Sequence, residues 1–498
     1  MTTMLNFDQV VALTQQTINT QFMLMTMNGT IDKNLNVTMP SNPKIGIEGT
    51  LKPPTISIRL DQGVNPQQVR FNINIDKGTA NYFSPVGELE HEKVDGYTIA
   101  MTVDLTQLTV TSDYKGLKVG DSTKAQTNKF LDQDIYTVTA ILLDLDNVNY
   151  GTAKIYNADG SENTSSTLTT LLSSIMKALI KDGNPYIISI HPKEKVSAQT
   201  GLDGFKPTGV MYNTHLYNNL NTPSNQSTYN MLIMNQGHDL PWTNVTLPKF
   251  TSNLIDKGDV SGKMYITKSQ FESVYIEDMV LPILKEAMGG NTDFTKSGNK
   301  WTYSYKTNQD GDHDGHGPVV GSDSGILDIY GNHQTDYHCE LNYNQSDSTA
   351  NQVVLKGSGY FFLRTDYYER PFGIWAHDAW SSAKKSFTFS ITLEAGADGK
   401  ITINFSNSTS DAVKDSWENI AVKFADLFNG GLQKELDAAN SSYATFEQGR
   451  FSSFTDNADN AFNVLEKMVI LPGASTYFFK DITTNAESDI IFNLTIKN

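Results

Sequence analysis

Two spacings of hydrophobic residues alternate along the chain, and each predicts a different kind of element. Where apolar residues recur every three or four positions, they share one face of an amphipathic helix. Where apolar and polar residues alternate, they predict a strand with one buried and one exposed face, as in antiparallel sheets. The predicted helices span residues 7–25, 166–181, 269–288, 417–428 and 459–469. The clearest predicted strands span residues 55–60, 69–76, 99–105, 136–142, 301–305, 353–355, 387–393, 401–405 and 490–496.

Residues that favour helix ends bracket two of these helices. Asn6 stands at the expected N-cap of the first helix, and Asn28, followed by glycine, predicts its end. Ser269 and Glu272 have the spacing of a capping box, in which two side chains satisfy free N–H groups at a helix start. Pro282 lies inside the helix that follows, and we expect it to bend that helix.

The order helix, strands, helix, strands occurs twice along the chain. The second round begins near the middle, and prolines within residues 236–268 mark the stretch where a boundary is expected. We therefore predict an α+β fold with two related domains, residues 1–250 and 251–498. Because the helices are grouped between runs of strands, the pattern argues against a doubly wound parallel sheet.

The composition narrows the classes of function. With 38 Lys+Arg and 55 Asp+Glu, the formal net charge is −17, which disfavours nucleic acid as a partner. Cys339 is the single cysteine, so no internal disulfide is expected. No apolar run has the length of a membrane-spanning helix. The first residues lack the basic region and cleavage site of a secretory signal, so we expect cytoplasmic synthesis, with release by a non-classical route left open.

Three stretches of the sequence resemble a known family. They are FDQVVALTQQTINTQF at residues 7–22, SGKMYITKSQFESVYIEDMVLPIL at 261–284 and VILPGASTYFFKDITTNAESDIIFNLTI at 469–496. Together they resemble the OrfX-type and forty-seven-kilodalton companion proteins encoded beside clostridial neurotoxins. The resemblance implies two domains of the tubular lipid-binding (TULIP-like) superfold, each a curved antiparallel sheet wrapped around a long helix. It also implies lipid binding and association with toxin action, and it supplies no catalytic residues.

A search for catalytic signatures gives no candidate site. The sequence contains no G-x-S-x-G, no H-E-x-x-H, no P-loop and no G-x-G-x-x-G. Cys339 follows His338 directly, and a lone cysteine is more often a small core residue than a nucleophile. Asp132 and Asp134 have the spacing of one strand face, which is typical of a solvated strand. We therefore predict that the protein is not an enzyme.

A cluster of aspartate and histidine has part of the spacing of a Ca²⁺ loop. Alternating carboxylates before a glycine surround one hard cation in such loops, but the twelfth position here is Gly321 rather than glutamate. A looser Ca²⁺ site or a His/Asp site for Zn²⁺ is one interpretation, and an exposed acidic hairpin tip without cofactor is the one we favour. The candidate ligands are Asp310, Asp312, Asp314, His313 and His316.

A second cluster mixes aromatic and basic residues. Trp and Tyr accept the boundary between water and lipid, and Lys and Arg meet phosphate groups there. The same residue types stack on sugar rings. A third interpretation is a loop packed over the edge of a domain, and we favour it because large aromatic residues usually lie in the core. The predicted membrane or ligand contacts are Arg370, Phe372, Trp375, Trp380, Lys384 and Lys385.

The resemblance, together with the aromatic–basic cluster, implies a non-enzymatic lipid- or membrane-binding protein that is a component of a bacterial toxin or insecticidal system. The alternative is a carbohydrate-binding or adhesin-like protein rich in strands, which a surface of Asn and Thr favours. The expected partners are a lipid or membrane surface and other toxin-cluster proteins, and not nucleic acid.

Overall fold

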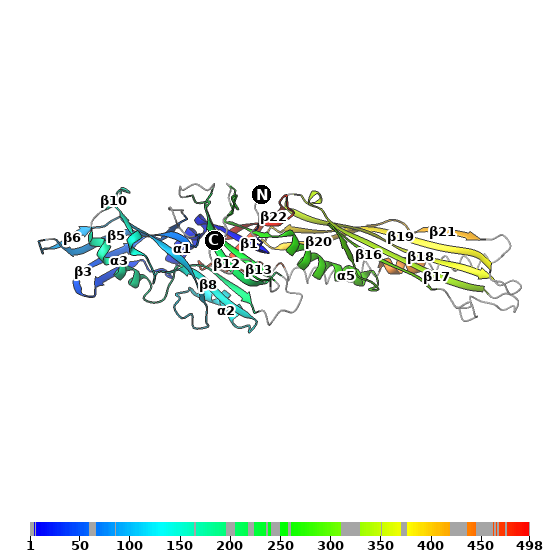
Figure 1. The fold of residues 1–498 in the computed structure, drawn as a ribbon, viewed down its shortest axis with the longest axis horizontal. Coiled ribbons are helices and arrows are strands. Elements are labelled where there is room, and N and C mark those ends of the chain that lie inside the picture. Colours follow the sequence, from blue (N-terminus) through cyan, green and yellow to red (C-terminus); the bar gives the residue numbers. More distant parts are fainter. Residues whose placement is uncertain are drawn as a thin grey trace.

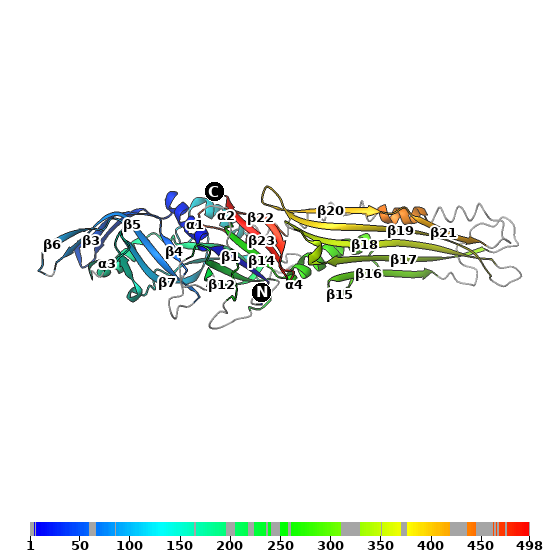
Figure 2. The same cartoon turned by 90° about the horizontal axis from the view of Figure 1, so that it is seen from above.

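In the computed structural model the chain forms an elongated molecule, with strands along most of its length (Figures 1 and 2). Both termini lie near the middle, and the two halves of the sequence extend from there in opposite directions (Figure 1). The described residues are 4, 6–58, 66–84, 86–163, 166–195, 205–217, 224–235, 238–240, 250–256, 260–309, 329–349, 351–369, 376–418, 436–444, 462, 465, 468–473 and 476–497.

A six-stranded antiparallel sheet at the middle joins the two halves. Its strands stand in the order β12-β13-β1-β14-β23-β22. The first strand of each half, β1 or β14, lies at the centre, and the last two strands of each half lie outside it, so the order is symmetric about the β1–β14 pair. The strands are β1 (Gln9–Thr14), β12 (Pro207–His215), β13 (Thr228–Asn235), β14 (Gly262–Ile266), β22 (Thr476–Thr484) and β23 (Ile490–Lys497).

Each half leaves the central sheet through the same local structure. The side chain of Thr14 accepts a hydrogen bond from the N–H of Thr17 and caps the first helix. The side chain of Thr267 accepts one from the N–H of Gln270 and caps the corresponding helix of the second half. Strand, threonine cap and helix therefore follow one another in both halves. The two helices are α1 (Gln15–Met27) and α4 (Lys268–Phe271).

In the N-terminal half, strands branch from one part of the sheet to another. β5 pairs with β3, β4, β6 and β7, and β7 also pairs with β8, whose other neighbour is β11. The β3–β5 register shifts between Thr50 and Leu51, and such bulges bend a strand and increase its twist. The strands are β2 (Asn34–Met39), β3 (Asn42–Leu51), β4 (Thr55–Ser57), β5 (Gln68–Phe83), β6 (Leu89–Lys93), β7 (Thr98–Thr109), β8 (Tyr136–Leu143), β9 (Lys154–Tyr156), β10 (Glu162–Asn163) and β11 (Ile187–Glu194).

Helix α1 takes the place of a strand partner for β4. The Asn19 side chain accepts the N–H of Ile56 at 2.8 Å and donates to its carbonyl oxygen at 3.1 Å. Gln15 Oε1 accepts the N–H of Ile58 at 2.7 Å. Two amide side chains thus satisfy backbone groups that would otherwise be buried without partners. The other helices of this half are α2 (Asp121–Leu131) and α3 (Ser166–Leu179), with a short 3₁₀ turn at Tyr150–Thr152.

The C-terminal half is a meander of long antiparallel strands. From β15 to β20 each strand pairs with the next, and β21 pairs with β19. The strands reach 18 residues in β18 and 20 in β19. They are β15 (Thr295–Ser297), β16 (Lys300–Gln309), β17 (Ile329–Tyr343), β18 (Gln352–Glu369), β19 (Ala376–Ala395), β20 (Ile401–Thr409) and β21 (Val413–Glu418).

The inner face of this meander carries a row of aromatic rings. Successive ring centroids lie between 5.0 and 6.3 Å apart. Gly357 and Gly359 of β18 pair with Phe389 and Phe387, and a Cβ on either glycine would collide with the paired ring. Glycine is therefore required where a ring lies flat across the neighbouring strand. The row consists of Tyr305, Tyr337, Phe361, Phe387, Phe389 and Phe405.

The helix that follows β14 changes its winding along its length. It begins as α4, continues as a π-helix (Glu272–Val280) and ends as α5 (Leu281–Ala287). Pro282 lies in the first turn of α5, directly after the π-helix, where the winding of this continuous helix changes. None of the described helices is long and apolar enough to cross a membrane.

The predicted α+β class with antiparallel sheets is confirmed, and the helix predicted for 166–181 is α3. The helix predicted for 7–25 is wrong over residues 9–14, which form β1. Every residue of β1 is buried because the strand lies at the centre of a sheet covered on both faces, so alternation is lost and its apolar run is indistinguishable from helix. Trp417, predicted to be helical, belongs to β21 and pairs with Trp380.

Candidate functional site

Two described residues of the predicted aromatic–basic cluster, Trp380 and Lys384, lie on one face of the C-terminal sheet, opposite the aromatic row. Along β18, Phe361 and Leu363 are buried, whereas Tyr360, Phe362 and Arg364 are partly exposed, as the alternation of a strand requires. The outer aromatic–basic face, as we call it, consists of His338 on β17, Tyr360 and Arg364 on β18, and Trp380 and Lys384 on β19.

Tyr360 lies between a histidine and a lysine from the two neighbouring strands. Its ring stacks on His338 with centroids 5.4 Å apart, and Lys384 Nζ lies 4.0 Å from its centroid. Its hydroxyl donates to Asp336 Oδ1 at 3.4 Å. Partial burial and the charge of Asp336 raise the pKa of Tyr360, so the phenol stays neutral and its ring attracts a cation.

Arg364 couples a carboxylate to an indole ring. Its Nη2 donates to Asp366 Oδ1 at 2.6 Å and its Nε donates to the same carboxylate at 3.0 Å. Its guanidinium carbon lies 4.6 Å from the centroid of Trp380. The planar guanidinium is suited to bind a carboxylate and stack on a ring at the same time, which fixes the position of Trp380 on the sheet.

One lysine of the outer aromatic–basic face keeps its charge available. Lys300 Nζ donates to Glu340 Oε1 at 2.6 Å, and His338 Nε2 lies 3.2 Å from the same oxygen. The hydrogen bond from Lys300, helped by His338, lowers the pKa of Glu340 despite its partial burial. Arg364 is likewise neutralised by its carboxylate. Lys384 is exposed and has no carboxylate partner among the described residues, so it can meet an anion such as a lipid phosphate.

The structure separates the residues that the sequence grouped as one site. Trp380 and Lys384 lie on the outer aromatic–basic face. Lys385 points to the opposite face, where its Nζ lies 5.5 Å from the ring centroid of Tyr443. The remaining members lie outside the described residues, as do all candidate metal ligands. These are Arg370, Phe372 and Trp375 from the aromatic–basic prediction, and Asp310, Asp312, Asp314, His313 and His316 from the metal prediction.

Sequence reasoning missed His338 as a member of this face. It is separated from Tyr360 by a whole hairpin, and the two meet only because they are cross-strand partners in the β17–β18 pairing. The usable signal was the alternation of β17, since His338 and Glu340 flank the buried Cys339. Burial raises the pKa of the Cys339 thiol, which agrees with a core residue rather than a reactive one.

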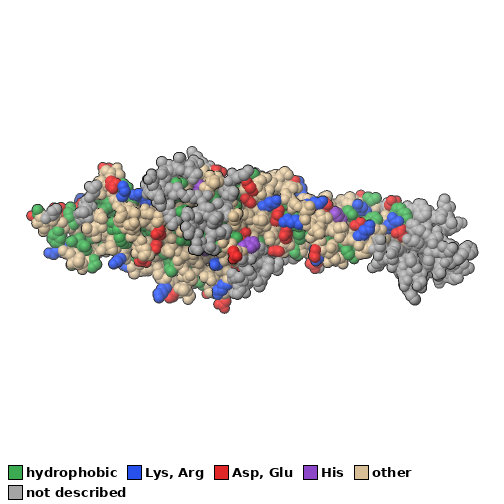
Figure 3. All heavy atoms as spheres, in the orientation of Figure 1, with side chains coloured by type: hydrophobic (Ala, Val, Ile, Leu, Met, Phe, Trp, Pro, Cys, Tyr) green, Lys and Arg blue, Asp and Glu red, His purple; other side chains and the backbone are tan. Residues whose placement is uncertain are grey.

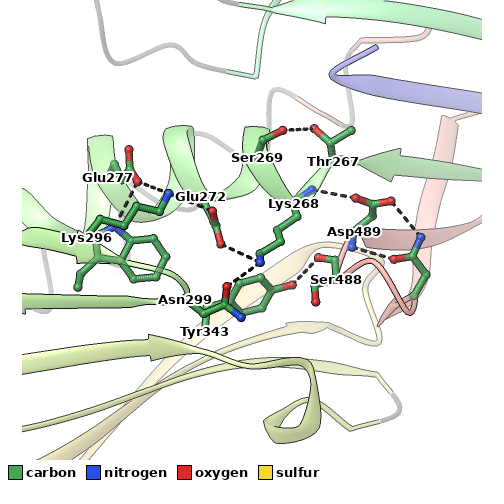
Figure 4. Close-up of polar contacts among 12 residues, drawn as sticks. Thr267, Lys268, Ser269, Glu272, Glu277, Lys296, Asn299, Tyr343, Ser488 and Asp489 are labelled. Atoms are coloured by element: carbon green, nitrogen blue, oxygen red, sulfur yellow. Dashed lines mark hydrogen bonds and ion pairs between the residues drawn. The ribbon is translucent and has the colours of Figure 1, made fainter. Parts of the chain in front are cut away.

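A second polar cluster connects the start of α4 to the strands around it (Figure 4). The backbone N–H of Lys268 donates to Asp489 Oδ1 at 2.9 Å, and its Nζ donates to Asn299 at 2.6 Å. Tyr343 donates to the carbonyl oxygen of Ser488 at 2.8 Å. These contacts connect the helix cap, the β15–β16 hairpin and the β22–β23 turn, so the cluster is a joint between the central sheet and the C-terminal sheet.

The π-helix gives this cluster its geometry. Lys296 Nζ donates to Glu272 at 3.0 Å and to Glu277 at 2.7 Å (Figure 4). Residues five apart share a side of a π-helix but not of an α-helix, whose neighbours are three and four apart. Burial disfavours the charge of Lys296, but the two hydrogen bonds outweigh it and raise the pKa of this lysine. Lys296 therefore pairs with two glutamates that the π-helix, and not an α-helix, places on the same side.

Comparisons with known proteins find similar chains among solved structures. No protein-family model and no curated protein matches the sequence. Among solved structures, the chain is similar to P47 from Clostridium botulinum A2, at 10% identity and TM-score 0.48 over 99% of this chain and 98% of that one. It is also similar to P47 of Clostridium botulinum E1 (11%, TM-score 0.45, 99% of both chains) and to a lipopolysaccharide binding protein (11%, 0.29, 99% of both). Two of these structures are P47 proteins, the forty-seven-kilodalton proteins that the sequence resembles.

Proposed function

We propose that this protein is a non-enzymatic lipid- or membrane-binding component of a bacterial toxin or insecticidal system. The outer aromatic–basic face is the observation that supports this most directly. It presents partly exposed rings together with a lysine that no described carboxylate neutralises. Rings of this kind settle at the headgroup level of a bilayer, and the lysine meets phosphate there.

We also propose that the two halves, residues 1–250 and 251–498, are TULIP-like domains in which a curved sheet encloses a helix. The repeated strand, threonine cap and helix support this, as does the symmetric order of the central sheet. Other toxin-cluster proteins are the protein partners that such a role requires.

Lys384 and Lys385 are adjacent in sequence, but their side chains lie on opposite faces of the sheet, so substitutions at the two positions form a matched test. The net charge of −17 repels anionic surfaces at distances beyond the Debye length of ~8 Å, so binding depends on local contacts and on salt. Lys384→Gln removes the outward charge, and we expect about fivefold weaker co-sedimentation with anionic liposomes, since one lysine near such a surface contributes about 1 kcal/mol. Lys385→Gln is the control, because that side chain lies on the inner face.

Trp380→Ala should weaken liposome binding further, and high salt should abolish the difference between the two lysine variants. Equal loss of binding in both lysine variants would assign the contact to another surface. If the wild-type protein does not co-sediment with anionic liposomes at low salt, the membrane role of this face is overturned.

The carbohydrate-binding alternative is less well supported by the same face. Sugar recognition needs an open ring face, whereas Lys384 and His338 cover Tyr360 from both neighbouring strands, and Arg364 covers Trp380. Retention on a glycan array, lost in Trp380→Ala, would favour this alternative.

A further inference from the structure

The end of the molecule opposite the C-terminal sheet carries an unusual hairpin tip, formed by the β5–β6 connection (Figure 1). Phe83 is 38% exposed, Val86 82% and Leu89 41%. Phe83 and Leu89 are direct cross-strand partners, and Val86 lies in the turn between them. Six large hydrophobic side chains are exposed among the described residues, and three of them belong to this apolar tip, as we call Phe83, Val86 and Leu89.

The fold does not need these side chains in their positions. Ala80 of β5 is fully buried, so alternation places Tyr82 on the core side of the strand and Phe83 on the outer side. Across the hairpin Glu90 pairs with Tyr82 and Leu89 pairs with Phe83, and Glu90 is itself exposed, so no core covers either face of the hairpin at its tip. Phe83 and Leu89 therefore form a cross-strand apolar pair in water, and an exposed apolar group of this kind is where an interaction site is expected.

The turn holds the apolar tip in a fixed shape. Ser84 N–H donates to the Glu88 carbonyl oxygen at 2.8 Å, and Gly87 N–H donates to the Ser84 carbonyl oxygen at 2.9 Å. Glu88 N–H donates to the Ser84 hydroxyl at 3.2 Å. Gly87 has a φ of +87°, which glycine adopts without strain. The tip is thus presented by an ordered turn and loses little conformational freedom on binding.

The surroundings of the tip indicate what it contacts. Figure 3 shows hydrophobic side chains gathered at the end of the molecule that carries β3, β5 and β6. The tip projects at the end of the long axis, so it reaches a flat surface before the rest of the chain (Figures 1 and 2). Glu88 and Glu90 lie beside the apolar residues and are exposed, which disfavours an anionic surface.

We propose that the apolar tip inserts into the surface of a bilayer made of zwitterionic lipid. A convex hairpin with apolar side chains on both strands and in the turn fits between headgroups, and its carboxylates meet the outermost ammonium groups of phosphatidylcholine. This contact is independent of the outer aromatic–basic face, which lies at the other end and depends on anionic lipid.

A fluorescent probe at the tip tests the insertion in the full chain. Val86→Cys is labelled with the environment-sensitive dye NBD, while Cys339 is fully buried and does not compete for the label. On phosphatidylcholine vesicles we expect a blue shift and a several-fold rise in emission, both insensitive to salt. Met27→Cys, whose side chain is 68% exposed at the end of α1, is the matched control and should stay in an aqueous environment.

Substitution of the cross-strand pair tests its contribution. Phe83→Ser with Leu89→Ser should reduce flotation with phosphatidylcholine vesicles at least tenfold, and Lys385→Gln, on the inner face of the C-terminal sheet, should leave it unchanged. Circular dichroism and thermal unfolding identify any loss of fold in the double variant. A probe at position 86 that remains aqueous with vesicles overturns the proposal. A blue shift that instead follows protein concentration without lipid also overturns it and assigns the tip to contact with a second copy of the chain.

Discussion

The two halves of this protein share the order of their first and last elements, and they differ in the sheet and the core between those elements. Both start with a central strand, a threonine cap and a helix, and both return to the central sheet with a closing hairpin. The N-terminal half then uses branching strands of up to 16 residues around a mainly aliphatic core, whereas the C-terminal half uses strands of up to 20 residues over a row of aromatic rings. The same order of first and last elements therefore accommodates two different sheets and two different cores.

The inner faces explain the difference in shape. In the β3–β5 pair of the N-terminal half, a bulge changes which residues face the core. In the C-terminal half the β16–β17 and β17–β18 pairs keep one register over their described length, and paired glycines make room for the rings. The β18–β19 register is unbroken from Gln352 to Tyr367, and this regular pairing is what presents Tyr360 and Lys384 side by side on one face.

The largest expected effect comes from truncating the aromatic row. Phe361 is 1% exposed and lies 5.0 Å from Tyr337 and 5.4 Å from Phe387 between ring centroids. Phe361→Ala should lower the free energy of unfolding by about 3–5 kcal/mol because it leaves a cavity in a fully packed site. Hydrogen exchange should show the loss of protection in β17, β18 and β19.

Phe71→Ala, also at a fully buried phenylalanine, is the matched variant in the N-terminal half. Its loss of protection should fall on β5 and β7. If each variant weakened both halves equally, the halves would be one cooperative unit, and the comparison between them would have no energetic meaning.

Lowering the pH should reduce the stability of the protein by a smaller amount, and this loss should fall on the N-terminal half. Burial lowers the pKa of His191 to about 4, from an ordinary value of 6.5, and also lowers the pKa of His215. The unfolded chain therefore binds a proton first, and stability is lost as the pH falls from about 6.5 towards 4. For His191 the loss reaches about 3 kcal/mol. Urea unfolding at pH 7 and pH 4.5 measures it, and His191→Gln should flatten the dependence. Parallel pH profiles in wild type and variant would contradict this assignment.

The smallest effect compares the two helix caps. Thr14→Ala and Thr267→Ala should each cost about 1 kcal/mol, since each removes an acceptor for a free N–H. Thr14 should cost more, because its buried hydroxyl also lies 2.8 Å from Thr17 Oγ1 and 3.3 Å from the Ser261 carbonyl oxygen. Thermal unfolding ranks the variants, and Thr→Ser at each position should keep the cap. A larger loss at Thr267 than at Thr14 would contradict this ranking.

Much of the secondary structure could be predicted because alternation is a local property. β5 and β7 bury every second residue over much of their length, and α3 shows a clean helical spacing. β1 could not be predicted, since a strand buried on both faces has no alternation, and only its neighbours β13 and β14 distinguish it from a helix. The cap at Thr267 was also missed. Ser269 and Glu272 match the spacing of a capping box, but the N–H groups at the helix start donate to Thr267 and Asp489 instead.

The sequence by itself determined the antiparallel class, the family resemblance and the concentration of aromatic and basic residues near β18 and β19. Those are properties of residue order, which folding does not change. Only the tertiary structure decided that Lys384 and Lys385 point to opposite faces of one sheet, and that His338 meets Tyr360 across a hairpin. Only the tertiary structure also decided that Phe83 and Leu89 face water, because a strand's register against its neighbours assigns each side chain to a face.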